Sequence, residues 1–131
     1  MNAAVDTNIL VRAIVRDDAA QAVLAAKLLR SANTIAVAVP CLCEFVWVLR
    51  TIYGFQPPAV AAAIRSLLDA QNVEVNRPAA EAGLAMLDGG GDFADGAIAY
   101  EGRWLGADTF VSFDKRAVEM LSAQGQAARL L

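Results

Sequence analysis

The chain has no histidine among its 131 residues, and its only two cysteines are Cys41 and Cys43. The lack of histidine excludes Ser-His and Cys-His nucleophilic sites and every metal site with an imidazole ligand. Two cysteines cannot by themselves complete a four-ligand zinc site or a disulfide framework. The chain has 14 acidic and 11 basic residues and a net charge of −3. If the protein is an enzyme, its polar chemistry is therefore expected to depend on carboxylates.

Long hydrophobic runs are also missing. The two longest apolar stretches, Ile35–Cys43 and Phe45–Leu49, are interrupted by Glu44 and fall short of the roughly 18–20 residues that a membrane span needs. No basic region precedes an apolar segment at the N-terminus, so a signal peptide is not expected. Two unpaired cysteines suit a reducing compartment. We expect a cytoplasmic protein in which residues 1–131 form a single domain.

Short apolar segments alternate with segments of helical length along the whole chain. This alternation predicts an α/β domain with a mostly parallel sheet. The expected strands cover residues 3–6, 34–39, 73–75, 109–112 and 127–130. The expected helices cover residues 19–30, 42–53, 59–70, 79–87, 93–105 and 117–122, with a helical turn starting at Ile9.

Acidic residues fall where the expected strands end or the following helices begin. Asp6 ends the first strand, Glu44 lies in the first turn of the helix after the second, and Asp114 follows the fourth. Asp95 lies in the first turn of the helix over residues 93–105, three residues after Asp92. Because ligands of such sheets bind outside the carboxyl ends of the strands, we expect these acids to gather at one edge.

Each acid also has a purely structural interpretation. Asp6 and Asp92 are good helix N-caps, and Asp114 suits a turn. Glu44 could be a first-turn acid that the helix dipole favours, but its neighbours in the sequence are apolar, and an acid embedded there needs a partner or a metal.

Clustered carboxylates repel one another unless a cation neutralises them. Oxygen ligands without histidine or cysteine select Mg²⁺ or Mn²⁺. The chemistry that matches such a site is phosphoryl or phosphodiester transfer.

Four segments resemble the motifs of the PIN-domain family, and within it the small VapC-type toxins of bacterial toxin–antitoxin pairs. The segments read V-D-T-N-I-L-V (Val5–Val11), P-x-x-x-E-x-x-x-V-L (Pro40–Leu49), D-F-A-D-G-A-I-A (Asp92–Ala99) and T-F-V-S-F-D-K (Thr109–Lys115). They occur in the family's order and cover essentially the whole chain.

The resemblance implies an endoribonuclease that depends on Mg²⁺ or Mn²⁺ and folds as a three-layer α/β/α sandwich. It also implies a homodimer and a cognate antitoxin that blocks the acidic site. The residues that match the family's catalytic, metal-binding acids are Asp6, Glu44, Asp95 and Asp114. Those that match its supporting positions are Thr7, Asn8, Asp92 and Ser112; at Ser112 the family more often has threonine.

The acidic net charge is unusual for a protein that binds RNA, because phosphate contacts normally come from Lys and Arg. Arg12, Lys115 and Arg116 are candidates for a local basic rim around the acids. Two other classes stay open: a phosphate-accepting receiver or phosphatase-like domain, which also gathers aspartates around Mg²⁺, and a non-catalytic domain that binds RNA or a protein partner. Asp6-Thr7-Asn8 does not fit the D-x-D-x-T pattern of the phosphatases.

Overall fold

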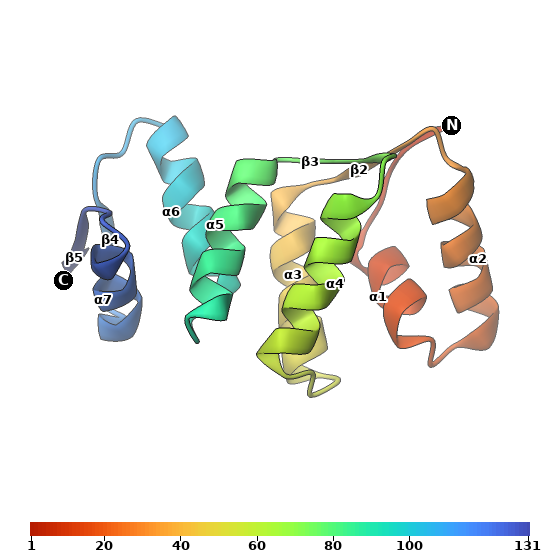
Figure 1. Ribbon diagram of the computed structural model, residues 1–131, viewed down its shortest axis with the longest axis horizontal. Helices are drawn as coiled ribbons and strands as arrows, with labels where there is room; N and C mark the ends of the chain where they lie inside the picture. The colour runs from red at the N-terminus through yellow and green to blue at the C-terminus, as the bar shows by residue number, and fades with distance from the viewer. The chain divides into compact units, whose positions relative to one another are not determined.

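The computed structural model describes residues 1–131 and separates into two compact units, unit 1 (Met1–Asn76) and unit 2 (Arg77–Leu131) (Figure 1). The strands are β1 (Asn2–Ala4), β2 (Thr34–Val37), β3 (Val73–Val75), β4 (Phe110–Ser112) and β5 (Ala128–Leu130). The helices are α1 (Thr7–Val15), α2 (Ala19–Ser31), α3 (Val39–Thr51), α4 (Pro57–Asp69), α5 (Arg77–Asp88), α6 (Phe93–Trp104) and α7 (Lys115–Ala123). None of these helices combines the length and the hydrophobicity needed to cross a bilayer.

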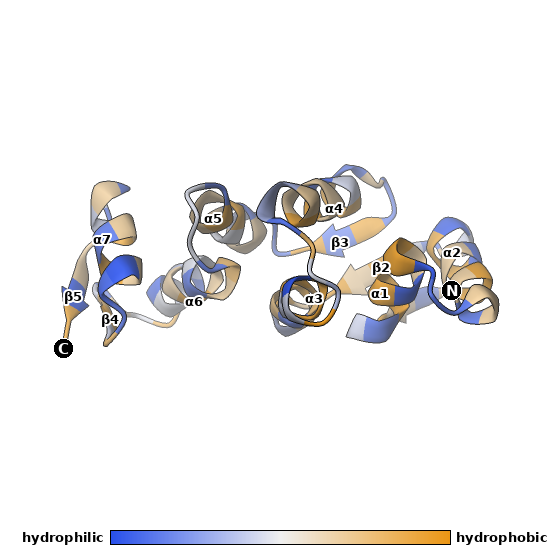
Figure 2. Cartoon of the chain, turned by 90° about the horizontal axis from the view of Figure 1, so that it is seen from below, coloured by the Kyte–Doolittle hydropathy of each residue, from blue (hydrophilic) through white to orange (hydrophobic).

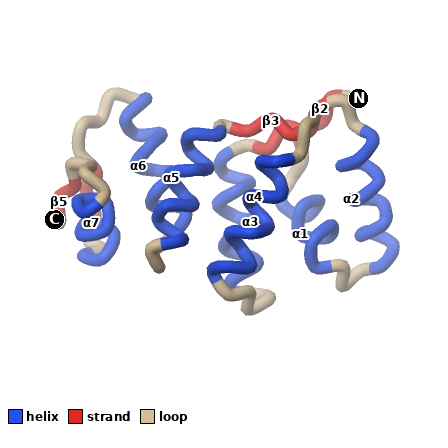
Figure 3. The backbone as a smooth tube through the Cα atoms, viewed as in Figure 1, coloured by secondary structure: helices blue, strands red, loops and turns tan.

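Unit 1 contains a parallel sheet of three strands in the order β1-β2-β3. Parallel neighbours need a crossover, and helix pairs provide it: α1 and α2 connect β1 to β2, and α3 and α4 connect β2 to β3 (Figure 3). The strands β2 and β3 are mostly hydrophobic apart from Glu74 in the middle of β3 (Figure 2). Ile35 of β2 is fully buried, as are Phe45 and Leu49 of α3 and Ile64 of α4. The core of unit 1 therefore lies where the helices pack against the central strand.

Unit 2 contains a second parallel pair, β4 and β5, connected by α7. Its core includes Met86, Ala99, Ala117 and Leu121, which come from α5, α6 and α7. The predicted α/β class with parallel strands is confirmed, and seven helices with a parallel three-stranded sheet are consistent with the predicted α/β/α fold.

Several predicted boundaries differ from the structure at the strand ends. β1 stops at Ala4, so Asp6 does not end the strand, and α1 begins at Thr7 instead of Ile9. β2 stops at Val37, and α3 begins at Val39 with Pro40 in its first turn. Proline costs little there, because the first backbone N–H groups of a helix have no partner within the helix. Pro40 therefore opens a helix, whereas the sequence suggested that it ends a strand.

Candidate active site

Asp6 caps the N-terminus of α1. Its Oδ1 accepts a hydrogen bond from the backbone N–H of Asn8 at 3.1 Å, which uses one of its two carboxylate oxygens. Asp6 and Asn8 also line a groove of about 470 Å³ between α1 and α2, together with Arg12 and Leu24. The backbone N–H of Asn8 thus contacts Asp6 while the side chain of Asn8 is exposed, and the supporting role of Asn8 stays a prediction.

A buried contact connects the residue after Asp6 to α3. The hydroxyl of Thr7, which is only 7% exposed, donates to Sγ of Cys41 at 3.8 Å. Burial raises the pKa of the Cys41 thiol, and the charges of Asp6 and Glu44 raise it further, against the lowering effect of the Thr7 hydrogen bond. Both carboxylates therefore act on the same thiol, and unit 1 brings Asp6 and Glu44 into one neighbourhood.

Glu44 lies on the exposed side of α3, one turn after Cys41. Its apolar neighbours Leu42, Phe45 and Val46 are buried, because they share the opposite face of the helix. The expectation that Glu44 is embedded among apolar side chains is wrong. It also lies beyond the first turn, since α3 begins three residues earlier than predicted.

Unit 2 places three acids at helix starts. Asp92 caps α6 by accepting from the backbone N–H of Ala94 at 3.1 Å, and Asp114 caps α7 by accepting from that of Ala117 at 3.2 Å. The hydroxyl of Ser112 accepts from the backbone N–H of Asp114 at 2.9 Å, which fixes the turn between β4 and α7. Asp95 lies in the first turn of α6, as predicted, and is partly buried.

The environment of Asp95 disfavours its charged form. Burial raises the pKa of Asp95, and the negative charges of Asp92 and Asp114 raise it further. The three carboxylates are thus near enough to repel one another, in the arrangement that a cation relieves. Unit 2 therefore places Asp92 and Asp114 within electrostatic reach of Asp95.

The donors in these two neighbourhoods fit a hard divalent cation. They are carboxylate oxygens, which suit Mg²⁺ or Mn²⁺, and the raised pKa of Cys41 disfavours the thiolate that a softer metal would use. Within neither unit do three or more acidic or cysteine side chains converge closely enough to hold a metal ion.

The three cations predicted for a basic rim have different surroundings. Arg12 is occupied inside unit 1, where it donates to Asp17 at 3.0 Å, to Gln21 at 2.7 Å and to the Tyr53 hydroxyl at 3.4 Å. Lys115 is exposed and lies 3.8 Å from Glu119. The exposed Arg116 packs its guanidinium against Gly90. Lys115 and Arg116 are thus the cations on the surface of unit 2 near Asp114.

The polar cluster of Arg12, Asp17 and Tyr53 was not apparent in the sequence, because Tyr53 lies 36 residues after Asp17. The Tyr53 hydroxyl donates to Asp17 at 2.9 Å, and this bond, followed by the charge of Arg12, lowers the pKa of Asp17 below its ordinary value of 3.8. The cluster ties the turn between α1 and α2 to the end of α3.

Removing the Tyr53 hydroxyl is expected to make the free energy of unfolding less dependent on pH in the acidic range. A carboxylate whose pKa is lowered by folding stabilises the protein above its unfolded-state pKa and loses that contribution as the pH falls through the folded value. Tyr53→Phe should lower the urea midpoint at pH 7 and reduce its decline between pH 5 and pH 3. Tyr100→Phe is the control, since Tyr100 accepts from the Trp104 indole and bonds no carboxylate. The same acid-dependent decline in both variants would contradict the role of this bond.

Comparisons with known proteins agree with the predicted fold and family. A search of curated proteins finds no match. A family model described as the PIN domain matches residues 3–120, a range that includes residues of both units and all the acids described above. PIN domains are generally nucleases that use divalent metal ions, and the family implies an RNA substrate. The extent of the match shows that the chain belongs to the PIN-domain family.

Proposed function

We propose that the protein is an endoribonuclease that requires Mg²⁺ or Mn²⁺ and serves as the VapC-type toxin of a toxin–antitoxin pair. In this proposal residues 1–131 form one PIN domain, which the family match across both units supports. The residues proposed to be catalytic and to bind the metal are Asp6, Glu44, Asp95 and Asp114.

The observation that carries the proposal is the environment of Asp95. Its pKa is raised by burial and by two neighbouring carboxylates, in a chain that has no histidine to act as a base. An acid in such an environment is a candidate functional group, because like charges nearby make its ionised form unfavourable, and a bound cation would offset that cost. The Cys41 environment in unit 1 supports the same interpretation for Asp6 and Glu44.

In the proposed reaction a water oxygen attacks phosphorus in line with the bond to the 3′ oxygen, which leaves and takes up a proton. The products are a 5′-phosphate and a 3′-hydroxyl. A bound Mg²⁺ or Mn²⁺ supplies a Lewis acid that offsets charge on the phosphate and lowers the pKa of water. Asp6 and Asp95 are the proposed principal ligands, and Glu44 and Asp114 would hold a second ion or ordered water.

Local contacts support the proposed roles of four further residues. Thr7 anchors the segment after Asp6 to α3, and Asp92 adds a negative charge beside Asp95. The backbone N–H of Asn8 donates to the Asp6 carboxylate, and the Ser112 hydroxyl accepts from the backbone N–H of Asp114. Lys115, Arg116 and, once released from Asp17, Arg12 are the cations proposed to contact RNA phosphates.

We also propose an antitoxin partner, a homodimer and a cytoplasmic location. The groove between α1 and α2 supports the antitoxin partner, because apolar residues such as Leu24 and Leu28 line it together with Asp6. Large hydrophobic side chains such as Trp47 and Ile52 are exposed on the surface, which supports the homodimer, because a second copy of the chain would cover them. Free Cys41 and Cys43 suit a reducing compartment.

Metal removal tests the proposed activity. Purified protein incubated with a mixed RNA pool should cleave it in Mg²⁺ or Mn²⁺, lose cleavage in EDTA and recover it when excess metal is restored. The new ends, mapped by sequencing, should carry 5′-phosphates. Cleavage that persists in EDTA, or ends with a 5′-hydroxyl, would exclude this mechanism. Absence of cleavage in either metal would favour a domain that only binds RNA or a partner.

A further inference from the structure

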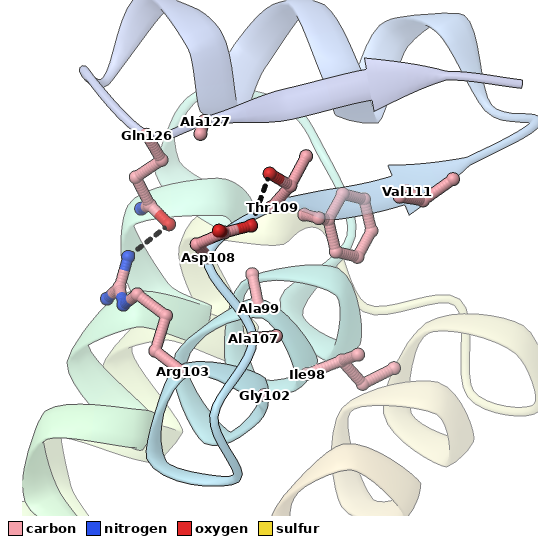
Figure 4. Close-up of a pocket in the computed structure, with 11 residues that line it drawn as sticks. Ile98, Ala99, Gly102, Arg103, Ala107, Asp108, Thr109, Val111, Gln126 and Ala127 are labelled. Carbon is pink, nitrogen blue, oxygen red and sulfur yellow. Dashed lines mark hydrogen bonds between the residues drawn. The ribbon is translucent and has the colours of Figure 1, made fainter.

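Unit 2 contains a pocket that the proposed acidic site does not use. Its volume is about 240 Å³, and it lies between the C-terminal half of α6, residues 107–111 and the segment before β5 (Figure 4). Asp95 lies in the first turn of α6 and Asp114 follows the far end of β4. Arg103 is eight residues after Asp95, which corresponds to about 12 Å along the helix. Ile98 and Ala99, which also line the pocket, lie about one turn after Asp95, so the pocket adjoins the acids, although none of them lines it.

Two opposite charges line this pocket without forming an ion pair with each other. Arg103 donates from Nη1 to Oε1 of Gln126 at 2.7 Å, and Asp108 accepts from the Thr109 hydroxyl at 2.8 Å (Figure 4). The guanidinium also lies over the Tyr100 ring, 5.7 Å from its centroid. Neutral neighbours thus orient both groups. Most donors of Arg103 and most acceptor sites of Asp108 stay available to a ligand.

The rest of the lining is apolar. Ile98 and Val111 are 57% and 51% exposed, and Phe110 and Ala127 add further hydrophobic surface. A pocket with apolar walls, a cation and a carboxylate suits a flat ligand that has hydrophobic faces and carries both donors and acceptors on its edge. An unpaired nucleobase has these properties, and proteins read single-stranded RNA by stacking and by bonding to base edges.

Resting on the proposed ribonuclease function, we propose that this pocket binds one guanine base of the RNA substrate. Guanine offers O6 and N7 as acceptors to Arg103, and its N1–H and N2 amino group as adjacent donors to Asp108. Adenine has an amino group in place of O6, so it would present a donor to the guanidinium. Cytosine and uracil each lack the paired donors that a carboxylate accepts side by side. The pocket would thus select cleavage sites with guanine at a fixed distance from the bond that is cut.

Titration calorimetry of the full-length protein with 5′-GMP, 5′-AMP, 5′-CMP and 5′-UMP tests the pocket directly. GMP should bind most tightly. Asp108→Asn and Arg103→Gln should each weaken GMP binding by about 10-fold or more, the discrimination expected of a bidentate base contact. Glu101→Gln is the matched control, because Glu101 is an exposed carboxylate on α6 outside the pocket. Circular dichroism verifies that all three variants are folded.

Equal affinity for the four nucleotides, or GMP binding that neither pocket variant changes, would overturn the proposal. Mapping of the cleaved RNA ends distinguishes a failure of the guanine pocket from a failure of the proposed ribonuclease function. Metal-dependent cleavage without selective GMP binding rejects the guanine pocket alone. Selective GMP binding that depends on Asp108 and Arg103, without cleavage of any RNA, keeps the pocket and rejects the nuclease. If both hold, Asp108→Asn should also remove the guanine preference from the cleavage sites.

Discussion

Asp95→Asn is expected to reduce RNA cleavage by at least about 100-fold, the size of effect seen when a charge-stabilising group is removed from an active site. The substitution keeps the shape of the side chain and removes the charge that would bind the metal. Asp95 is the acid whose pKa the fold raises through burial and through Asp92 and Asp114. Initial cleavage rates in saturating Mg²⁺, compared with those of the parent protein, measure the effect.

The same substitution should make the metal-free protein more stable at neutral pH. A carboxyl group whose pKa is raised by folding destabilises the folded state once it is ionised, and the neutral amide of the variant would avoid that cost. The advantage should shrink as the pH falls below the folded-state pKa of Asp95 and disappear below the ordinary value of 3.8, where the carboxyl is protonated in both the folded and the unfolded state. Thermal melting in EDTA across this pH range tests the prediction.

Glu101→Gln is the control for both measurements, since it removes an exposed charge from the same helix. It should leave cleavage and metal-free melting nearly unchanged. Full activity of a clean Asp95→Asn preparation would remove Asp95 from the proposed site. A loss of activity accompanied by a lower melting temperature would instead indicate a folding defect.

Gly96→Ala is expected to have the largest effect on stability. Gly96 lies in α6 where it crosses α5, and a Cβ there would overlap the backbone carbonyl oxygen of Ala82 and approach the Met86 side chain within 2.8 Å. The backbone of α5 at Ala82 cannot move aside without separating the two helices. We expect a loss of about 3 kcal/mol or more, at the upper end of the cost of overpacking. A loss of this size takes up a large part of the stability of a small domain.

Gly102→Ala is the matched control, because it adds the same methyl group to the same helix. A Cβ at Gly102 meets only the Ala107 side chain, at an ordinary 3.9 Å. Alanine should therefore stabilise α6 by up to about 1 kcal/mol through its higher helix propensity. Urea unfolding of both variants measures the contrast. Equal stability of the two would show that α5 and α6 do not pack as closely as the structure indicates.

The sequence predicted the order of strands and helices well where periodicity and capping agree. β3 falls at residues 73–75 as expected, and α6 begins at Phe93 after its Asp92 cap. It failed at the start of α3, because Pro40 suits both the end of a strand and the first turn of a helix. Only the packed helix, with Leu42, Phe45 and Leu49 buried on one face, decides between them.

For the candidate site, the sequence placed Asp6, Asp92, Asp95 and Asp114 next to helix starts, as the structure has them, but it misplaced Glu44. It also predicted correctly that Asp6 and Asp92 are good N-caps. Of the two, only Asp6 is a proposed catalytic residue, so at Asp6 one carboxylate would serve both capping and catalysis. It did not show that Glu44 is exposed, that Cys41 lies near both Asp6 and Glu44, or that Tyr53 bonds Asp17. Exposure depends on how a helix packs, and the Thr7–Cys41 and Tyr53–Asp17 contacts join residues of different segments, so local patterns do not report them.

The absence of histidine, the supply of carboxylates and the alternation of strands and helices were settled by the sequence alone, because composition and short-range periodicity are local properties. The tertiary structure decided which side of a helix each acid faces, which carboxylates repel one another, and that Arg103 and Asp108 line the same pocket. Burial and Coulomb interactions depend on distances across the fold, so these properties arise only once the chain has packed.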